Sequence, residues 1–409
     1  MGNVTSMVIV GGGLAAAKAA ETLRGEGFDG DVVVITAEDV PPYERPPLSK
    51  GVLTGSDADD VIFVHDEQWY RDQKIDLREG VRATAVDRAG RTVALSDGST
   101  VGYDKLLLAT GSAPRKLRAP GADLDGVHYL RTKRNSDALK QALSAGDKRV
   151  VVVGAGWIGL DVASAARGYH NEVTVIEPQP APLRAALGDE LGGMFADLHR
   201  EHGVDLRLGT GVTEILGDGT AVTGVRTDGG LTVPADLVVV GVGARPMDEL
   251  AVDAGLAVDN GVLVDAALRT SDENIYAAGD VANAEHPVLG RRIRVEHWAN
   301  ALNQGPAAAK SMLGQQVGYD HIPYFYTDQY DLGMEFTGDL GGEPFDRIVY
   351  RGNREGREFI VFWTAAGRVL AGMNVNVWDV ADDIAALVRS GRAVDLAKLA
   401  DPEVPLAEV

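Results

Sequence analysis

Two glycine-rich segments are the parts of this sequence best suited to chemistry, because they offer backbone amides to a phosphate. They read Val10-Gly11-Gly12-Gly13-Leu14-Ala15-Ala16 and Val153-Gly154-Ala155-Gly156-Trp157-Ile158-Gly159. Each follows a run of apolar, β-branched residues and precedes a helical pattern, as in the strand–loop–helix unit that binds dinucleotides. The free N–H groups and partial positive charge of each helix N-terminus would then face a pyrophosphate.

The glycines of these loops have separate tasks. Gly11 and Gly154 permit the tight turn after the strand, and Gly13 and Gly156 let a pyrophosphate approach the backbone. Gly159 keeps the third position small, where the helix meets the strand.

An acidic residue follows each unit, at the end of the next apolar run. Glu38 is placed to accept hydrogen bonds from a ribose. A carboxylate in the position of Glu177 binds the ribose 2′-hydroxyl of NAD and repels the 2′-phosphate of NADP. The six residues after Glu177 contain no Arg or Lys that could receive that phosphate, so the sequence favours NAD. The alternative interpretation is two glycine-rich turns with structural acids.

Two dinucleotide sites in one chain indicate NAD as one ligand and FAD as the usual other. The stretch Tyr276-Ala277-Ala278-Gly279-Asp280-Val281 supports FAD, because a carboxylate that closes a strand here can hold a ribityl hydroxyl. The structural alternative for Asp280 is the N-cap of a helix.

Composition excludes several classes of protein. A net charge of −21 over 409 residues makes nucleic acid and anionic membranes poor partners. The absence of cysteine excludes disulfides, thiolate metal sites and a redox-active dithiol. No apolar run approaches the ~20 residues of a membrane span, and no signal peptide fits the start. We therefore expect a cytoplasmic protein without a bound metal, and the sequence gives no oligomeric state.

The elements that must position these loops alternate in type. Apolar runs predict buried strands at residues 8–10, 32–35, 106–109, 150–153, 173–176, 237–240 and 275–278, with helices at 15–23 and 158–167 between some of them. This alternation predicts an α/β fold with parallel sheets. The last ~85 residues instead predict a hairpin at 357–364 and 368–375, followed by a helix at 378–389 that ends at Gly391. Ile384, Leu387 and Val388 would form the apolar side of that helix.

On these residues the chain resembles the FAD-dependent ferredoxin reductases of oxygenase systems, over nearly its whole length. The most specific stretch is Pro42-Tyr43-Glu44-Arg45-Pro46-Pro47-Leu48-Ser49-Lys50. Further matches are Ala109-Thr110-Gly111, residues 154–160, Gly241-Val242-Gly243, Gly279-Asp280, Asn300-Ala301 with Gln304, and Thr327-Asp328-Gln329-Tyr330.

The resemblance implies two Rossmann-like dinucleotide-binding domains and a C-terminal α+β domain. FAD would bind residues 1–113 together with 245–322, NAD would bind the inserted residues 114–244, and residues 323–409 would form the interface domain. The residues expected to contact FAD are Gly11, Gly13, Leu14, Ala15, Glu38, Arg45, Lys50, Ala83, Thr110, Gly111, Arg131, Asp280 and Trp298. Those expected to contact NAD are Gly154, Gly156, Trp157, Ile158, Gly159, Glu177 and Gly243.

The resemblance also implies the activity, in which hydride from NADH passes to the flavin and single electrons then pass to an iron–sulfur partner that feeds an oxygenase or P450. Lys50 would lie near flavin N5, paired with Asp161, where the family has glutamate. Because aspartate is one methylene shorter, we expect a looser or water-bridged contact. A purely structural ion pair is the alternative. Trp157 would cover the flavin until nicotinamide displaces it, or pack at a domain interface.

The segment Glu296-His297-Trp298-Ala299-Asn300 predicts a helix start whose N-terminus faces the flavin. His297 is expected to be a packing or surface histidine rather than a catalytic one. Tyr326 stands where relatives often have tryptophan, beside the flavin. This departure bears on the identity of the partner more than on flavin binding.

The expected partner is a ferredoxin, usually an acidic protein, so this chain would need a basic docking patch. Arg291, Arg292 and Arg294 are the first candidates, and Arg115, Lys116 and Arg118 form a second cluster. Solvated loop charge is the alternative for both. A rubredoxin reductase, a monodehydroascorbate reductase and a flavin-based redox sensor resembling apoptosis-inducing factor remain as other functions.

Overall fold

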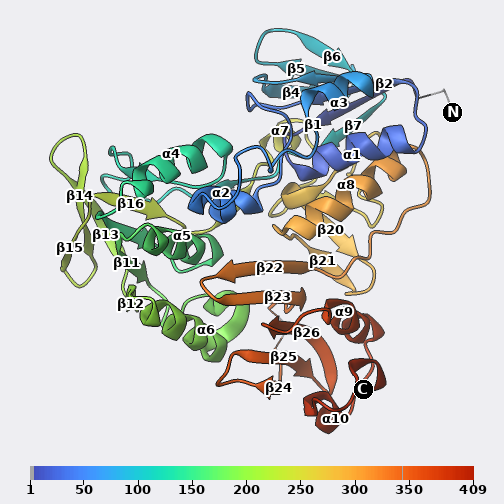
Figure 1. Cartoon of the computed structure of the whole chain (residues 1–409). Coiled ribbons are helices and arrows are strands. Elements are labelled where there is room, and N and C mark those ends of the chain that lie inside the picture. Colours follow the sequence, from blue (N-terminus) through green and yellow to red (C-terminus); the bar gives the residue numbers. More distant parts are fainter. Residues whose placement is uncertain (1–3, 343) are drawn as a thin grey trace.

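The computed structural model describes residues 4–342 and 344–409. Its first layer is a parallel sheet in the order β19 (Ile275–Ala277), β7 (Lys105–Leu108), β1 (Ser6–Val10), β2 (Asp31–Ile35) and β3 (Ile75–Arg78). Helices α1 (Leu14–Gly25) and α8 (Trp298–Met312) pack against each other beside it (Figure 1). Strands and helices from residues 6–108 and from residues 275–312, which are far apart in the sequence, therefore share one hydrophobic core.

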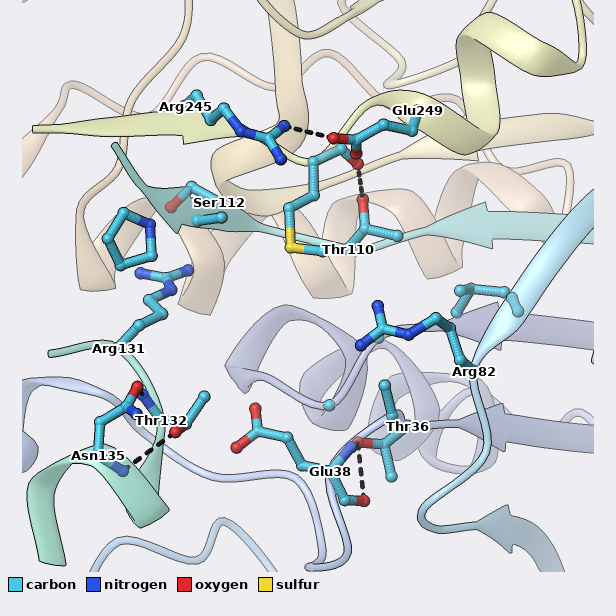
Figure 2. Close-up of a pocket in the computed structure, with 18 of the residues that line it drawn as sticks. Thr36, Glu38, Arg82, Thr110, Ser112, Arg131, Thr132, Asn135, Arg245 and Glu249 are labelled. Atoms are coloured by element: carbon cyan, nitrogen blue, oxygen red, sulfur yellow. Dashed lines mark hydrogen bonds and ion pairs between the residues drawn. The ribbon is translucent and has the colours of Figure 1, made fainter. Parts of the chain in front are cut away.

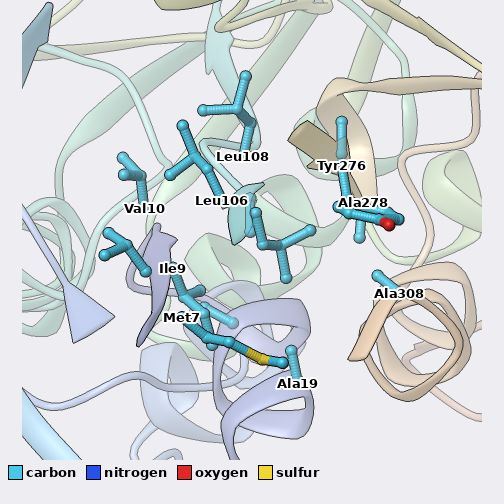
Figure 3. Packing of buried hydrophobic residues seen from close by; sticks show 14 of the residues in the cluster. Met7, Ile9, Val10, Ala19, Leu106, Leu108, Tyr276, Ala278 and Ala308 are labelled. Carbon is cyan, nitrogen blue, oxygen red and sulfur yellow. The ribbon is translucent and has the colours of Figure 1, made fainter. Parts of the chain in front are cut away.

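Apolar side chains fill both faces of this sheet. Met7, Ile9 and Leu106 are fully buried and lie among Ala19 and Ala308 of the two helices (Figure 3). Burial on both faces explains why these strands are continuous apolar runs and do not alternate.

A second parallel sheet has the order β12 (Asp205–Leu208), β11 (Glu172–Glu177), β10 (Arg149–Val153), β16 (Leu237–Val240) and β9 (Val127–His128). The helices of this part of the chain are α4 (Lys133–Ser144), α5 (Trp157–Gly168) and α6 (Arg184–Glu201). The strand–loop–helix unit of the first sheet is thus repeated here, as predicted.

Smaller sheets accompany the two parallel ones. Two are antiparallel and three-stranded: β4 (Ala83–Asp87), β5 (Thr92–Leu95) and β6 (Thr100–Gly102), and β13 (Val212–Gly217), β14 (Val222–Thr227) and β15 (Thr232–Pro234). A third contains β18 (Val262–Val264), β20 (Ala282–His286) and β21 (Arg291–Ile293). Short helices are α2 (Gly51–Thr54), α3 (Glu67–Asp72) and α7 (Glu249–Asp253).

The chain crosses between the two parallel sheets on a two-stranded ladder. In it β8 (Ser112–Pro114) pairs antiparallel with β17 (Ala244–Pro246). The predicted domain boundaries at 113/114 and 244/245 fall on these strands. The division into domains remains a prediction, and this ladder fits it.

The C-terminal part is a five-stranded antiparallel sheet in the order β22 (Tyr324–Gln329), β23 (Leu332–Gly338), β26 (Arg368–Val375), β25 (Glu358–Ala365) and β24 (Arg347–Asn353). Helices α9 (Ala381–Ser390) and α10 (Leu396–Ala400) follow it. The predicted fold of two Rossmann-like units plus an α+β domain is confirmed, as is the hairpin.

The start of the last long helix shows the largest difference from a predicted boundary, while several strand ends differ by one residue. The last long helix was expected from residue 378 but begins at Ala381, because Asp379 adopts a left-handed backbone with φ of +62°. Its apolar side is buried as predicted, and Gly391 ends it with φ of +57°. Among the described residues, no helix has the length and apolar character needed to span a membrane.

Candidate functional site

Two cavities meet between the first sheet, the second glycine loop and strand β22. Their volumes are about 910 and 350 Å³, and both are lined by Gly12, Arg45, Thr110 and Arg131. Every residue predicted to contact FAD lines one or both of them. Figure 2 shows the larger cavity, with Glu38, Arg131 and Arg245 around it. The shared lining residues make the two cavities adjacent, so together they offer more room than either alone for an extended dinucleotide.

The first glycine loop shapes one wall of this site. A Cβ on Gly11 would lie 2.1 Å from the carbonyl oxygen of Ala109, so this position must stay glycine. A Cβ on Gly13 would meet nothing within 4 Å, although Gly13 is the N-cap of α1. The first N–H groups of a helix have no partner within it. The loop therefore leaves both space and donors for a phosphate group.

Glu38 lines the larger cavity and is held in place by two donors. The Tyr43 hydroxyl donates to it at 2.6 Å and the Arg45 guanidinium at 3.0 Å. Burial raises the pKa of Tyr43 to about 12; the Glu38 carboxylate adds to this and the Arg45 charge opposes it. Tyr43 therefore stays protonated and keeps donating to Glu38.

Asp280 lies in the smaller cavity beside Arg131. It accepts hydrogen bonds from the Ser112 hydroxyl at 2.7 Å and from Arg131 at 2.9 Å. Burial alone would raise the pKa of Asp280, but the charge of Arg131 and the Ser112 hydroxyl bring it below its usual value. The N-cap of this short helical turn is Ala278, so the N-cap alternative for Asp280 is wrong.

Two residues that line this cavity each have a buried nitrogen without a hydrogen-bond partner in the part of the chain that the structure describes. These nitrogens are Nε of Arg131 and Nδ1 of His297. Buried polar groups without a partner cost free energy, so they indicate a polar ligand. Together with the open space at Gly13, they show that the residues present fit FAD.

Lys50 and Asp161 both line the smaller cavity and contact each other there. The Lys50 ammonium lies 3.1 Å from Oδ2 of Asp161, and the two side chains are 17% and 5% exposed. The expectation of a looser or water-bridged contact is wrong. The direct contact is possible because α5 and the helical turn at 46–49 pack together, which brings the shorter aspartate close enough.

Helix α8 directs its N-terminus at the same cavity. Its first residue is Trp298, whose indole N–H donates to Glu44 at 2.9 Å and whose ring lies 6.3 Å from that of Tyr326. The N-cap is His297, whose ring lies 4.5 Å from Phe325. The helix was expected to begin near residue 296, and its start at Trp298 agrees. That its N-terminus faces the flavin stays a prediction.

Burial of His297 predicts acid sensitivity of the protein without cofactor. Burial lowers the pKa of this imidazole to about 4, and nearby carboxylates offset the effect only in part. Because the unfolded chain binds a proton near pH 6.5 and the folded one does not, stability falls as the pH drops from 6.5 towards 4. His297→Gln should remove about 2 kcal/mol of the loss between pH 7 and pH 5, measured by urea unfolding. The same substitution at the exposed His321 is the control and should change nothing.

The second glycine loop repeats the geometry of the first. A Cβ on Gly154 would lie 2.4 Å from the oxygen of Gly241, and one on Gly159 would lie 2.1 Å from the oxygen of Gly154. A Cβ on Gly156, the N-cap of α5, would meet nothing within 4 Å. Glu177 accepts the amide of Ala155 at 2.7 Å, so its carboxylate lies beside the loop as predicted.

Only some of the residues predicted to contact NAD line the two cavities. Trp157 and Ile158 line the smaller cavity, and Trp157 packs against Phe325 with ring centroids 4.9 Å apart. Gly154, Gly156, Gly159, Glu177 and Gly243 line neither cavity. Contact of these residues with NAD stays a prediction, as does covering of the flavin by Trp157.

The sequence prediction missed several residues of the site. Ser112 and Phe325 are examples, together with Gly12, Thr36, Pro46, Arg82, Met247 and Ala301. Ser112 directly follows the matched Thr110-Gly111, and Phe325 precedes Tyr326, so proximity to known motifs was the available signal.

The arginines predicted to dock a partner each contact an acidic side chain. Arg291 lies 2.8 Å from Asp339, Arg292 lies 2.6 Å from Glu285, and Arg294 lies 2.6 Å from Glu296. The side chain of Arg294 is only 11% exposed. Arg115, Lys116 and Arg118 form no such ion pair within residues 4–342 and 344–409.

Two family descriptions cover most of the chain. Pyridine nucleotide-disulphide oxidoreductase matches residues 5–305, and Reductase C-terminal matches residues 324–409. The anthranilate 1,2-dioxygenase system ferredoxin–NAD(+) reductase component of Burkholderia cepacia is 41% identical over 406 residues, which are 98% of each chain. A rubredoxin–NAD(+) reductase of Pseudomonas putida is 36% identical over 372 residues, 91% of this chain and 96% of that one.

Solved structures agree over the whole length. A ferredoxin reductase from Rhodopseudomonas palustris matches with a TM-score of 0.94 at 36% identity, covering 99% of this chain and 100% of that one. A chain in the covalent putidaredoxin reductase–putidaredoxin complex also gives 0.94, at 34% identity and with 99% and 98% covered. This chain therefore belongs to the pyridine nucleotide-disulphide oxidoreductase family, in a form that carries the Reductase C-terminal domain.

Proposed function

We propose that this protein is an FAD-dependent NADH:ferredoxin oxidoreductase. The observation that carries the proposal is one cavity that both loop segments line, the first with Gly12 and Gly13 and the second with Trp157 and Ile158. Lys50 lines the same cavity. Family membership supports FAD and NAD(H) as the cofactors. The lack of cysteine excludes the disulfide chemistry in the family's name.

The residues of the chain have distinct tasks in this activity. When bound, FAD supplies the conversion between a two-electron donor and one-electron acceptors. Asp280 and Arg131 would hold the polar chain of the cofactor, while Lys50 and the N-terminus of α8 provide positive potential where negative charge develops. Trp157 and Phe325 exclude water from the face where nicotinamide would lie.

Steady-state NADH oxidation with a panel of acceptors tests the proposal. We expect fast reduction of a [2Fe-2S] ferredoxin and much slower turnover with NADPH, because Glu177 would repel its 2′-phosphate. Preferential reduction of rubredoxin or of monodehydroascorbate would replace the ferredoxin assignment. A persistent charge-transfer band with dimerisation, and no fast acceptor, would indicate a redox sensor.

For docking we retain Arg291, Arg292 and Arg294 as the proposed patch, although their own acids offset part of the charge. Reversing Arg291 and Arg292 to glutamate should slow reduction of an acidic ferredoxin roughly tenfold, because electrostatic steering raises association rates. NADH-to-ferricyanide activity should not change. Equal loss of both activities contradicts docking there, and a loss confined to reversal of Arg115 and Lys116 moves the patch to that cluster.

A further inference from the structure

Gln329, the last residue of β22, lies buried between two helices of the second parallel sheet. Its amide nitrogen donates to Oδ1 of Asp161 on α5 at 2.9 Å. Its amide oxygen lies 3.0 Å from Nε2 of His199 on α6. Gln329 is 1% exposed and His199 is fully buried. One side chain of the C-terminal sheet thus joins both helices.

Four donors surround the Asp161 carboxylate. Ser49 and Lys50 donate to Oδ2 at 2.9 and 3.1 Å, while Thr327 and Gln329 donate to Oδ1, each at 2.9 Å. The Thr327 hydroxyl also accepts from the Lys50 ammonium at 2.8 Å. A carboxylate has about four acceptor positions, so all are used. The carboxylate is therefore fixed in orientation, and it fixes Lys50.

These contacts determine the direction of every hydrogen bond in the network. Because Asp161 only accepts, Gln329 must turn its NH₂ group to Asp161 and its oxygen to His199. His199 then donates from Nε2, and its Nδ1 accepts from the Tyr330 hydroxyl at 3.3 Å. Burial lowers the pKa of His199, which favours the neutral ring with one N–H that this arrangement needs.

We propose that Gln329, oriented by His199, is a positioning residue that sets how far the Lys50 ammonium reaches into the flavin cavity. This inference rests on the proposed function. Without the amide, the buried Asp161 carboxylate lacks one donor and depends more on its remaining cation. The ammonium then lies closer to Asp161 and farther from the cavity, where it stabilises a reduced flavin less.

The midpoint potential of bound FAD, measured by spectroelectrochemical titration, tests this inference. Gln329→Leu should lower the equilibrium constant for flavin reduction about tenfold, a shift of about 30 mV to more negative potential for two electrons. His199→Phe should shift the potential in the same direction but less, because the amide then keeps its contact with Asp161 and loses only its orienting partner.

Arg354→Gln is the matched control. Arg354 joins the turn between β24 and β25 to Glu190 on α6 at 2.7 Å, so it links the same two parts of the molecule without touching the network. The midpoint potential of FAD bound to Arg354→Gln should equal that of FAD bound to the parent protein. An equal shift in this variant, or an unshifted potential in Gln329→Leu, overturns the proposal.

A second readout needs no cofactor and no turnover. In the unaltered apoprotein, ¹⁵N NMR should show His199 protonated at Nε2, and Gln329→Leu should change the signal of this nitrogen. A proton on Nδ1 in the parent contradicts the hydrogen-bond directions. Because neither measurement uses a ferredoxin, failure to reduce ferredoxin would reject the proposed function and leave this result standing.

Discussion

Gly13→Ala should give a folded protein that has lost most of its affinity for FAD. Gly13 has φ of −112° and ψ of −175°, which alanine adopts readily, and a Cβ there meets nothing within 4 Å in the protein. The added methyl can therefore collide only with a ligand. Overpacking of this kind costs up to about 3 kcal/mol, so the dissociation constant of FAD should rise roughly 100-fold.

The measurement is fluorescence titration of the apoprotein with FAD, with thermal unfolding as the check on folding. Gly156→Ala is the matched variant in the second loop, where the added Cβ also meets open space. It should retain FAD and raise the KM for NADH by one to two orders of magnitude, on the same overpacking scale. Gly11→Ala should instead damage folding, because its Cβ would lie 2.1 Å from a carbonyl oxygen. Normal FAD affinity in Gly13→Ala would contradict the assignment of this loop.

These glycines were predictable because the elements around them are neighbours in the sequence. A strand, a turn and a helix N-terminus are consecutive in the chain, so spacing alone places Gly13 and Gly156 at the entrance to a helix. The strands were predictable for a similar reason, since burial on both faces leaves continuous apolar runs.

The features that the sequence did not predict depend on contacts between segments far apart in the chain. Gln329 and His199 are 130 residues apart in the sequence and meet only because β22 packs beside α5 of the second parallel sheet. The left-handed backbone of Asp379 delays the last long helix, and no residue there marks it as glycine would. The ion pairs of Arg292 and Arg294 likewise depend on the final fold and remove part of the charge that the sequence offered for docking.

The buried ion pair of Lys50 with Asp161 should contribute strongly to the stability of the apoprotein. Lys50→Met should lower the free energy of unfolding of the apoprotein by about 3 kcal/mol, because breaking a buried ion pair leaves an uncompensated charge. Asp161 retains three neutral hydrogen-bond donors, so we expect a loss of stability at the lower end of the usual range for breaking a buried ion pair. The same substitution at Lys140, which pairs with Asp59 at 3.0 Å on the surface, should cost less than about 1 kcal/mol.

Rate measurements on the same variant separate a structural pair from one that also serves the flavin. If the ammonium stabilises negative charge in the cavity, Lys50→Met should slow flavin reduction by NADH roughly 100-fold in stopped-flow experiments. A structural pair predicts the loss of stability with an unchanged rate at low temperature, where the variant stays folded. Equal stability of Lys50→Met and Lys140→Met would contradict both interpretations, since the buried Asp161 carboxylate cannot lose its paired cation without a cost in stability.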